Sequence, residues 1–427
     1  MSYRSHAEVK PANAPWIEEI PAHWDERPFY AVAKERRAKN TGMKEDNLLS
    51  LSYGNIVRKD INTPNGLLPE SFETYQIVEP DDVVFRLTDL QNDKRSLRSA
   101  ICPERGIITS AYLAVRSEGV LPGFMNYLMR AYDVQKVFYS MGGGMRQSLG
   151  FEDVRRMSVV APNLDEQTAI ARFLDRETGL IDGLIEKKTR FIALLKEKRA
   201  AVITHAVTKG IDPDAPMKDS GQDWLGRVPA HWDVVPATAL FTVSGERARE
   251  GDQMLSATQK YGVIPLAEYE ALEQRQVTMA VVNLDMRKHV ELGDFVISMR
   301  SMDGGLERAR AVGSVRSSYS VLKPGPDVEG RFYGALMKSS LYIQALRLTS
   351  NFIRDGQDLN FGHVRKVKLP KPDLREQAAI ADYIEAETAR IDGLISLTER
   401  SIDLLREKRA ALITAAVTGK IDVRAAA

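Results

Sequence analysis

Hydrophobic side chains recur every three or four residues along two long segments, 164–208 and 374–418. The apolar positions of the first are Ile170, Leu174, Ile181, Leu184, Phe191, Leu195 and Val202; those of the second are Ile380, Ile384, Ile391, Leu394, Leu405 and Leu412. A stripe that returns about every seven residues is typical of a helix that packs against another helix. The pattern predicts two long helices, each extending roughly 67 Å at about 1.5 Å per residue.

The two segments are near copies of each other. Residues 164–212 and 374–422 are identical at 29 of 49 positions when they are aligned at an offset of 210. Two helices of equal length and sequence most simply pair as an antiparallel coiled coil, because an isolated helix would leave its apolar stripe in water. The alternative is that each helix packs separately on its own domain. Gly183 and Gly393, mid-helix in both copies, suggest a close backbone approach; the alternative is that the helix simply tolerates glycine there.

Start and stop signals flank both segments. Asn163 and Asp373 can cap the helices, and a glutamate follows three residues later in each, as in a capping box. Gly210 and Gly419 lie just beyond the apolar stripe, where a glycine commonly ends a helix. The boundaries are therefore predicted from polar residues as well as from the stripe.

The regions before the helices read as mostly strand. Residues 25–160 contain short runs of β-branched and aromatic residues broken by turn signals, with one helix expected from Phe124 to Tyr139. Residues 233–370 repeat a few of these landmarks, such as the Asp82-Val-Val-Phe run and its counterpart Asp294-Phe-Val-Ile, but otherwise differ strongly. A common frame with two different surfaces suggests two different binding specificities.

A short turn motif precedes each strand-rich region. Trp16-Ile-Glu-Glu-Ile-Pro-Ala-His-Trp24 returns 208 residues later as Trp224-Leu-Gly-Arg-Val-Pro-Ala-His-Trp232. A catalytic role for His23 and His231 is disfavoured, because neither comes with a cysteine or serine nucleophile motif. We interpret both histidines as parts of a packing turn.

These patterns predict an α+β fold made of two tandem halves related by pseudo-twofold symmetry. Each half is a mostly-β domain followed by a long helix, and the two helices pair as an antiparallel coiled coil. The predicted parts are a first mostly-β domain (1–160), the first helix (161–210), an exposed linker (211–223), a second mostly-β domain (224–370), the second helix (371–420) and a tail (421–427).

Composition limits the possible locations and partners. The chain has 427 residues, one cysteine and a formal net charge of +1, so any nucleic-acid binding must come from local basic patches. With a single cysteine it cannot form an internal disulfide, which favours a reducing compartment. No apolar run approaches 18 residues and the first residues do not resemble a signal peptide, so we expect a cytoplasmic protein without a membrane partner.

Signatures of catalysis are absent from the sequence. It has no Walker A loop, no Asn-Pro-Pro-Tyr methylation motif and no His-Glu-x-x-His zinc helix, and Gly142-Gly-Gly144 lacks the surroundings of a dinucleotide fingerprint. We therefore predict no catalytic residue, no metal ligand and no cofactor in this chain.

Basic loops at matching places in both halves are the candidate DNA contacts. Their Arg, Gln and Asn side chains suit base edges and their Lys side chains suit phosphates, although any one loop alone is more simply a solvated surface. The candidates are Arg86, Gln91, Asn92, Lys94, Arg95, Arg98, Arg146 and Gln147 in the first half, and Arg300, Arg308, Arg310, Arg316, Arg354 and Gln357 in the second.

The repeated motifs resemble a known family. A Trp-x-x-x-Ile-Pro-x-x-Trp turn, a variable region, a helix start from Pro162 to Gln167 and an Ile-Asp-x-Leu-Ile run occur twice, with Val228 in place of the isoleucine in the second turn. Together they resemble the specificity subunit of type I restriction–modification systems over nearly the whole chain. Segment 86–100 is also similar to one subtype of that family's target-recognition domain.

The resemblance implies a function without catalysis. Two target-recognition domains would each read one half of a bipartite, asymmetric site on double-stranded DNA, and the helices would set the gap. Two methyltransferase subunits would dock on the helices, and restriction subunits could join them. S-adenosylmethionine, ATP and magnesium would be bound by these partners. We place the docking residues in the repeated Leu-Leu-x-Glu-Lys-Arg segments: Lys196, Lys198, Arg199, Arg406, Lys408 and Arg409.

Two other functions remain open at this stage. One is a stand-alone DNA-binding regulator with two tandem readers, against which stands the lack of a helix-turn-helix pattern. The other is a coiled-coil adaptor that does not bind DNA, against which stands the divergence of the globular regions beside preserved helices.

Overall fold

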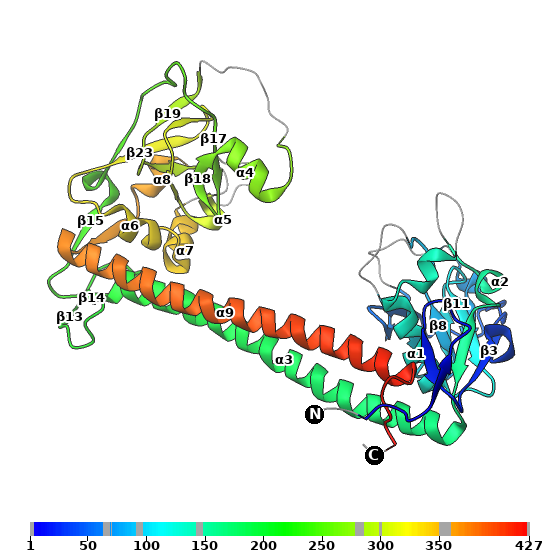
Figure 1. Cartoon of the computed structure of the whole chain (residues 1–427). Helices are drawn as coiled ribbons and strands as arrows, with labels where there is room; N and C mark the ends of the chain where they lie inside the picture. The colour runs from blue at the N-terminus through cyan, green and yellow to red at the C-terminus, as the bar shows by residue number, and fades with distance from the viewer. Residues whose placement is uncertain are drawn as a thin grey trace. The chain divides into compact units, whose positions relative to one another are not determined.

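The computed structural model divides the chain into two compact units, residues 1–189 with 400–427 and residues 190–399 (Figure 1). It describes residues 4–62, 69, 71–90, 97–141, 148–277, 286–298, 301–349 and 360–424. Each unit contains one strand-rich region and a stretch of each of two long helices, α3 (Leu164–Lys209) and α9 (Leu374–Val417). The α+β class predicted from the sequence is confirmed.

The predicted ends of both long helices are confirmed. The Asn163 and Asp373 side chains each accept the backbone N–H three residues ahead at 2.9 Å, which satisfies a donor that the helix leaves free. Gly210 and Gly419 follow the last turns with φ of 77° and 74°, a left-handed conformation that favours glycine. A side chain at Gly419 would also collide with the ring of Pro21, 2.2 Å away.

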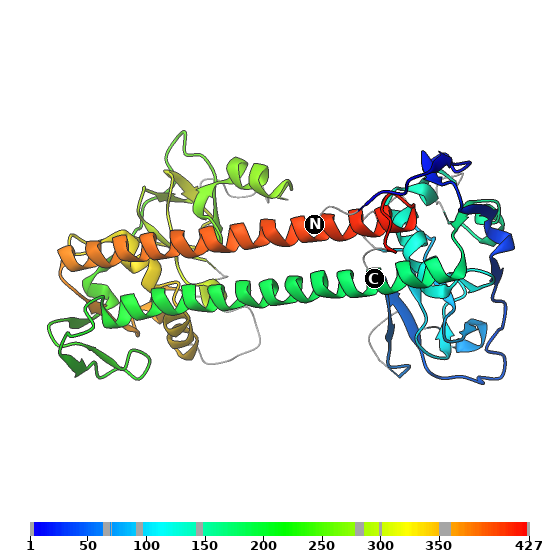
Figure 2. The ribbon, with the colours of Figure 1, turned by 60° about the horizontal axis from the view of Figure 1, so that its bottom comes forward.

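Within each unit the two long helices lie side by side and run antiparallel (Figure 1, Figure 2). In the first unit Ile170 and Leu174 of α3 share a core with Ala416 of α9, and the Arg409 Nε donates to the Asp182 Oδ1 at 2.9 Å. The second unit repeats this arrangement with the helices exchanged. Ala206 and Val207 of α3 share a core with Ile380 and Ile384 of α9. Arg199 and Asp392 form the matching ion pair at 2.9 Å.

The apolar stripe is wider than the seam between the helices. Leu184, Phe191 and Leu394, all predicted to be buried, are 47 %, 46 % and 40 % exposed. Ile192 and Ile402 take places in the seam instead. A two-helix contact buries only one narrow face of each helix, so one apolar column is left outside it. The close backbone approach predicted at Gly183 and Gly393 is wrong, since apart from the adjacent backbone of the same helix no atom lies within 4 Å of a Cβ built at either residue.

The strand-rich regions of the two units share one plan. A four-stranded antiparallel sheet has the order β4-β11-β8-β9 in the first unit and β16-β23-β20-β21 in the second. Its strands in the first unit are β4 (Ala33–Glu35), β11 (Leu113–Ser117), β8 (Val83–Phe85) and β9 (Ser99–Ile101). Those in the second are β16 (Phe241–Val243), β23 (Ser320–Pro324), β20 (Phe295–Ile297) and β21 (Glu307–Arg308).

Pairs of shorter strands surround each sheet. In the first unit they are β1 (Val9–Pro11) with β2 (Glu19–Pro21), β3 (Asp25–Pro28) with β12 (Ser158–Ala161), β5 (Leu49–Ser52) with β6 (Asn55–Arg58), and β7 (Gln76–Val78) with β10 (Gly106–Ile108). In the second they are β13 (Met217–Asp219) with β14 (Arg227–Pro229), β15 (Asp233–Pro236) with β24 (Lys368–Lys371), β17 (Leu255–Thr258) with β18 (Gly262–Pro265), and β19 (Lys288–Val290) with β22 (Gly313–Val315). Strand β13 lies in segment 211–223, which was predicted to be an exposed linker.

Short helices complete each unit. They are α1 (Pro122–Val134) and α2 (Phe151–Val154) in the first, and α4 (Leu266–Glu273), α5 (Ser301–Gly304), α6 (Gly330–Leu336), α7 (Ser340–Leu348) and α8 (Phe361–Val364) in the second. Helix α1 ends five residues before the predicted end at Tyr139, because Lys136 adopts a left-handed conformation with φ of 63° and a 3-10 turn follows. Within the described residues, no helix is both long enough and apolar enough to cross a membrane.

The glutamine of the repeated Glu-Gln pair ties each long helix to its globular region. Gln167 accepts the backbone N–H of Leu121 at 2.7 Å and donates to the Pro162 carbonyl at 2.7 Å. Gln377 makes the matching bonds to Glu329 and Pro372 at 2.8 Å each. Both glutamines are buried, so each places its domain on the helix through bonds to backbone atoms.

Candidate nucleic-acid interface

In both units, an equivalent turn precedes the strand that leads into the candidate DNA-binding loop. Asp82 and Asp294 each accept a backbone N–H from the residue three positions earlier, at 2.8 and 2.9 Å, and strands β8 and β20 begin directly afterwards. Arg86 and Ser298 therefore occupy equivalent positions at the ends of these strands. The sequence prediction that the two regions share a frame holds at this point of the sheet.

Arg98 supports the loop that follows β8 in the first unit. Its side chain is fully buried, and its Nη1 donates to the carbonyls of Arg86 at 3.2 Å and Thr88 at 2.7 Å. Its backbone N–H donates to the Asp133 carboxylate at 3.0 Å. A guanidinium with no exposed surface cannot reach DNA, so we remove Arg98 from the DNA contacts and assign it to loop support. Arg86 is half-buried and remains a candidate.

Several other predicted contacts lie outside the described residues. They are Gln91, Asn92, Lys94, Arg95, Arg146 and Gln147 in the first unit, and Arg300, Arg354 and Gln357 in the second. The predicted contacts that the structure does describe are Arg86, Arg98, Arg308, Arg310 and Arg316.

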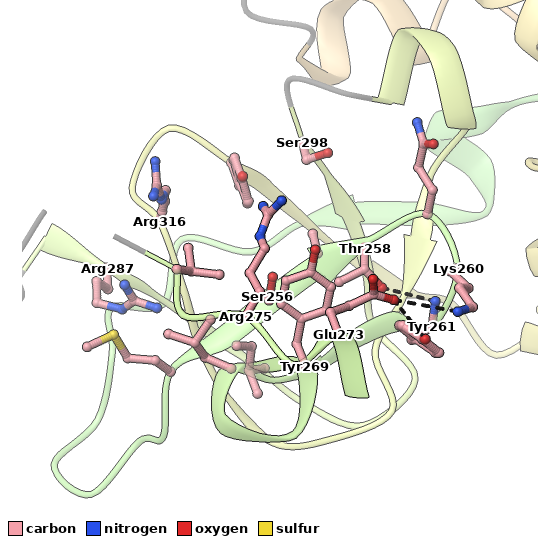
Figure 3. A pocket seen from close by; sticks show the side chains of 17 residues that line it. Ser256, Thr258, Lys260, Tyr261, Tyr269, Glu273, Arg275, Arg287, Ser298 and Arg316 are labelled. Carbon is pink, nitrogen blue, oxygen red and sulfur yellow. Dashed lines mark hydrogen bonds and ion pairs between the residues drawn. The ribbon is translucent and has the colours of Figure 1, made fainter. Parts of the chain in front are cut away.

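The second unit contains a cleft of about 580 Å³ (Figure 3). The hairpin of β17 and β18, helix α4 and the loops before β19 and β23 supply its walls. Four cationic side chains line it, together with one carboxylate and three tyrosines: Lys260, Arg275, Arg287, Arg316, Glu273, Tyr261, Tyr269 and Tyr319. Cations, hydroxyls and aromatic faces in one concave surface suit phosphates and bases.

The cations of the cleft differ in how firmly they are held. Arg287 donates to the Ser314 Oγ at 3.0 Å and to its carbonyl at 2.6 Å. Burial, and then the nearby charge of Arg316, lower the pKa of Arg287. Lys260 lies 3.5 Å from Glu273, and a hydrogen bond from Tyr261, followed by the Lys260 charge, lowers the pKa of that carboxyl group. The side chain of Arg316 is exposed and has no hydrogen-bond or ion-pair partner among the described residues, so it can bind an external anion.

The other two predicted arginines of the second unit lie outside the lining of the cleft. Arg308 is on the edge strand β21, and its guanidinium lies across Gly330 at the start of α6, where a Cβ would come within 2.6 Å of it. Arg310 lies beside Gly262, the first residue of β18. Arg316 therefore lines the cleft together with cations that the sequence analysis did not single out, whereas Arg308 and Arg310 do not line it.

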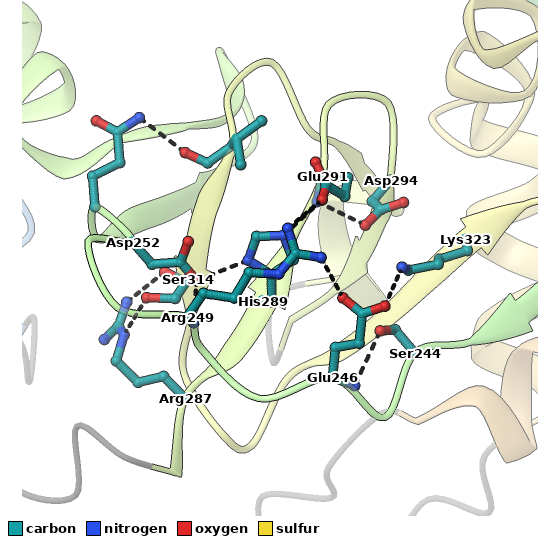
Figure 4. Close-up of polar contacts among 12 residues, drawn as sticks. Ser244, Glu246, Arg249, Asp252, Arg287, His289, Glu291, Asp294, Ser314 and Lys323 are labelled. Carbon is teal, nitrogen blue, oxygen red and sulfur yellow. Dashed lines mark hydrogen bonds and ion pairs between the residues drawn. The ribbon is translucent and has the colours of Figure 1, made fainter.

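A polar network fixes strand β19 beside the cleft residue Arg287 (Figure 4). The buried ring of His289 lies between two carboxylates, 2.8 Å from Asp252 and 2.9 Å from Glu291. Arg249 bridges Glu291 to Glu246 at 2.8 and 2.9 Å. Burial acts to lower the pKa of His289, but the hydrogen bonds to Asp252 and Glu291 outweigh it and raise the pKa above its ordinary value.

The six predicted docking residues on the long helices fall into two groups. Arg199 and Arg409 are half-buried and engaged in the ion pairs that join the helices. Lys196, Lys198, Arg406 and Lys408 are exposed, and Arg406 pairs with Asp403 on its own helix at 3.1 Å. Exposed leucines accompany them at repeated positions: Leu184 and Leu394, and Leu194 and Leu404, which are 53 % and 59 % exposed.

Sequence reasoning missed Lys260, Arg275 and Arg287, which join Arg316 only because a hairpin and a helix bring four separate segments together. The interleaving of tyrosines and basic residues between 260 and 287 is the signal that could have found them.

Known proteins were compared with the chain in sequence and in structure. No family model matches it. It is 22 % identical over 323 residues, 71 % of this chain and 69 % of the relative, to MjaX of Methanocaldococcus jannaschii, described as a type I restriction enzyme specificity subunit. The fold matches the HsdS subunit of Thermoanaerobacter tengcongensis with a TM-score of 0.52 and 16 % identity, covering 94 % of this chain and 98 % of that one.

A further solved structure, which concerns complex assembly and conformational transition of the type I R-M system, matches with a TM-score of 0.65 and 17 % identity. This match covers 94 % of our chain and 99 % of the other. The resemblance to type I specificity subunits is confirmed. The specificity-subunit fold therefore accounts for the duplicated plan: two strand-rich regions held by two long helices.

Proposed function

We propose that this chain is the DNA-recognition subunit of a type I restriction–modification complex. The observation that carries the proposal is the combination of a duplicated frame with surfaces that differ. The sheets have the same strand order and the helices the same caps, whereas the residues at the loop ends, Arg86 and Ser298, are not alike. Two different readers on one frame suit a bipartite, asymmetric DNA site.

The cleft of the second unit is the proposed contact surface for one half-site. Its cations can neutralise phosphates, and an arginine such as Arg316 can also bind a guanine edge through two hydrogen bonds. Arg86 and the loop supported by Arg98 are proposed to serve the other half-site. In this proposal, the sequence read by each unit depends on its own loops and not on the shared helices.

The repeated leucines are the proposed docking surface for two copies of one methyltransferase subunit. Leu184 and Leu404 belong to the first unit, and Leu394 and Leu194 are their counterparts in the second. Exposed apolar side chains at matched positions mark interaction surfaces. The glycines beside them, Gly183 and Gly393, leave room for a partner's side chains. We propose that these partners supply methylation and restriction, and that they bind S-adenosylmethionine, ATP and magnesium.

The decisive experiment is to sequence the methylated positions of the source genome with and without this gene. Loss of methylation at one bipartite motif is the expected result, and an unchanged methylome would contradict the proposal. Replacing residues 25–160 by the matching region of a relative should then change one half of that motif. The other half and the gap should stay the same, because the second unit's loops and the repeated helices are untouched; a change in both halves would refute the division between the units.

A further inference from the structure

Three side chains with metal-binding atoms meet in the first unit. His6 comes from the arm before β1, His23 from the turn between β2 and β3, and Glu166 from the first turn of α3. One ligand atom from each lies within 4.8 Å of those of the other two. Glu166 and His23 are 143 residues apart in the sequence, so no local motif announces the group.

The group is largely shielded from water. His6 and Glu166 are 9 % and 4 % exposed, whereas His23 is 43 % exposed and leaves one side open. The His23 Nε2 lies 2.9 Å from the Glu166 Oε2. The Nδ1 of His6 is buried with no hydrogen-bond partner, although a buried polar atom normally has one.

The charges around the group favour the binding of a cation. Asp422 and Arg424 lie beside the group and pair with each other at 2.7 Å. The Glu166 carboxylate therefore contributes a net negative charge to a site with two imidazoles. Two histidine nitrogens with one carboxylate oxygen are a donor set that zinc and similar first-row dications prefer, with a fourth position left for water.

The second unit offers an internal comparison. His231 and Glu376 repeat the pair at 2.8 Å. His6 lies three residues before strand β1. The residue three positions before the matching strand β13 is Asp214, which is exposed. Among the described residues, only the first unit gathers three such ligands. The histidine–glutamate pair is therefore part of the common frame, and His6 is the addition that turns it into a potential site.

We propose that His6, His23 and Glu166 bind one zinc-like dication. Bound there, the metal fastens the N-terminal arm to the start of α3. The C-terminal tail joins the same place, because the backbone N–H of Asp422 donates to the Arg4 carbonyl at 2.7 Å. The ion thus has a structural role, distinct from the magnesium and nucleotide chemistry proposed for partner subunits.

The test uses the untagged full-length chain after removal of metal with a chelator. Calorimetric titration with zinc should show one equivalent bound, and cobalt(II) should give the visible absorption of a low-coordinate site with nitrogen ligands. His6→Ala and Glu166→Gln should each weaken zinc binding at least tenfold. His231→Ala and Glu376→Gln, the same changes in the second unit, should leave it unchanged.

Thermal unfolding supplies a second readout. Zinc should raise the Tm of the wild type and of His231→Ala but not that of His6→Ala, whose circular dichroism checks that it still folds. The proposal is overturned if the wild type binds no zinc at millimolar concentration. It is equally overturned if His6→Ala binds zinc as the wild type does, or if the variants of the second unit lose binding to the same extent.

Discussion

At the scale of single residues, the glutamate of the repeated Glu-Gln motif has a role that differs from the predicted one. A capping box would turn Glu166 back to the backbone of Asn163. Asn163 does cap the helix, but the Glu166 carboxylate instead meets His23, as Glu376 meets His231. The motif therefore joins each helix to the preceding Trp-Pro-Trp turn, and the histidines do more than fill that turn.

Arg316 should be the most sensitive of the described DNA candidates. We expect Arg316→Ala to weaken binding of the specific duplex by roughly 1–3 kcal/mol, because it removes an exposed, unpaired cation of the cleft. Arg308→Ala is the matched control, since that guanidinium packs over α6. Fluorescence anisotropy of the assembled complex at several salt concentrations would measure both. An equal loss for the two variants would show that the cleft is not the contact surface.

His289 should make the stability of the second unit depend on pH. Its pKa in the folded chain is raised, so the protonated ring stabilises the fold fully below the unfolded value of about 6.5. That contribution is lost as the pH rises through the folded pKa. His289→Gln should lower stability by roughly 1–3 kcal/mol at pH 6 and by less at pH 9. Urea unfolding at both values tests this; a deficit that is constant with pH would contradict the linkage.

At the scale of elements, the long helices could be read from the sequence because their signals are local. The stripe, the caps Asn163 and Asp373 and the terminal glycines all depend on neighbours within a turn or two. The stripe could not tell which apolar column faces the other helix, so Leu184 and Phe191 were placed in the seam although they are exposed. Which column faces the partner depends on how the two helices are rotated about their axes relative to each other. The sequence of one helix alone does not determine this rotation.

The candidate DNA-binding site was harder to predict from the sequence, because it too depends on how distant segments are arranged in space. Arg316 was found because basic residues occur at matching places in both halves of the sequence. Arg98 was misassigned, since a buried arginine that donates to backbone carbonyls has the same local sequence as an exposed one. Arg275 and Arg287 are brought to the cleft by tertiary folding alone.

The exposed leucines lead to a prediction about partner docking. Leu184→Ser and Leu394→Ser should each change the free energy of unfolding by less than about 0.5 kcal/mol, because neither side chain is in the seam. Each should remove one methyltransferase copy from the complex, and the double variant should remove both. Native mass spectrometry counts the copies. Leu348→Ser is the control, because Leu348 is 82 % exposed on α7; retention of both copies in the double variant would refute the docking surface.

At the scale of the whole molecule, a segment early in the chain and a segment late in the chain meet in the first unit. Asp422 is hydrogen-bonded to Arg4 there, whereas the matching segment of the second unit, 211–216, is unbroken. The strands that follow, β1 and β13, then occupy the same position in each plan. The hydrogen bond between Asp422 and Arg4 therefore joins two separate segments at the place where the second unit has one continuous segment.

The reciprocal ion pairs have a consequence for the gene. Helix α3 carries both Asp182 and Arg199, and α9 carries both Asp392 and Arg409, so each copy holds an acceptor and a donor for the other. A crossover within the stretch that encodes either helix would preserve these ion pairs, provided that the other gene encodes the same aspartate and arginine at these positions. New pairs of globular regions can then be joined in one step of recombination, and each resulting chain inherits a frame that already fits.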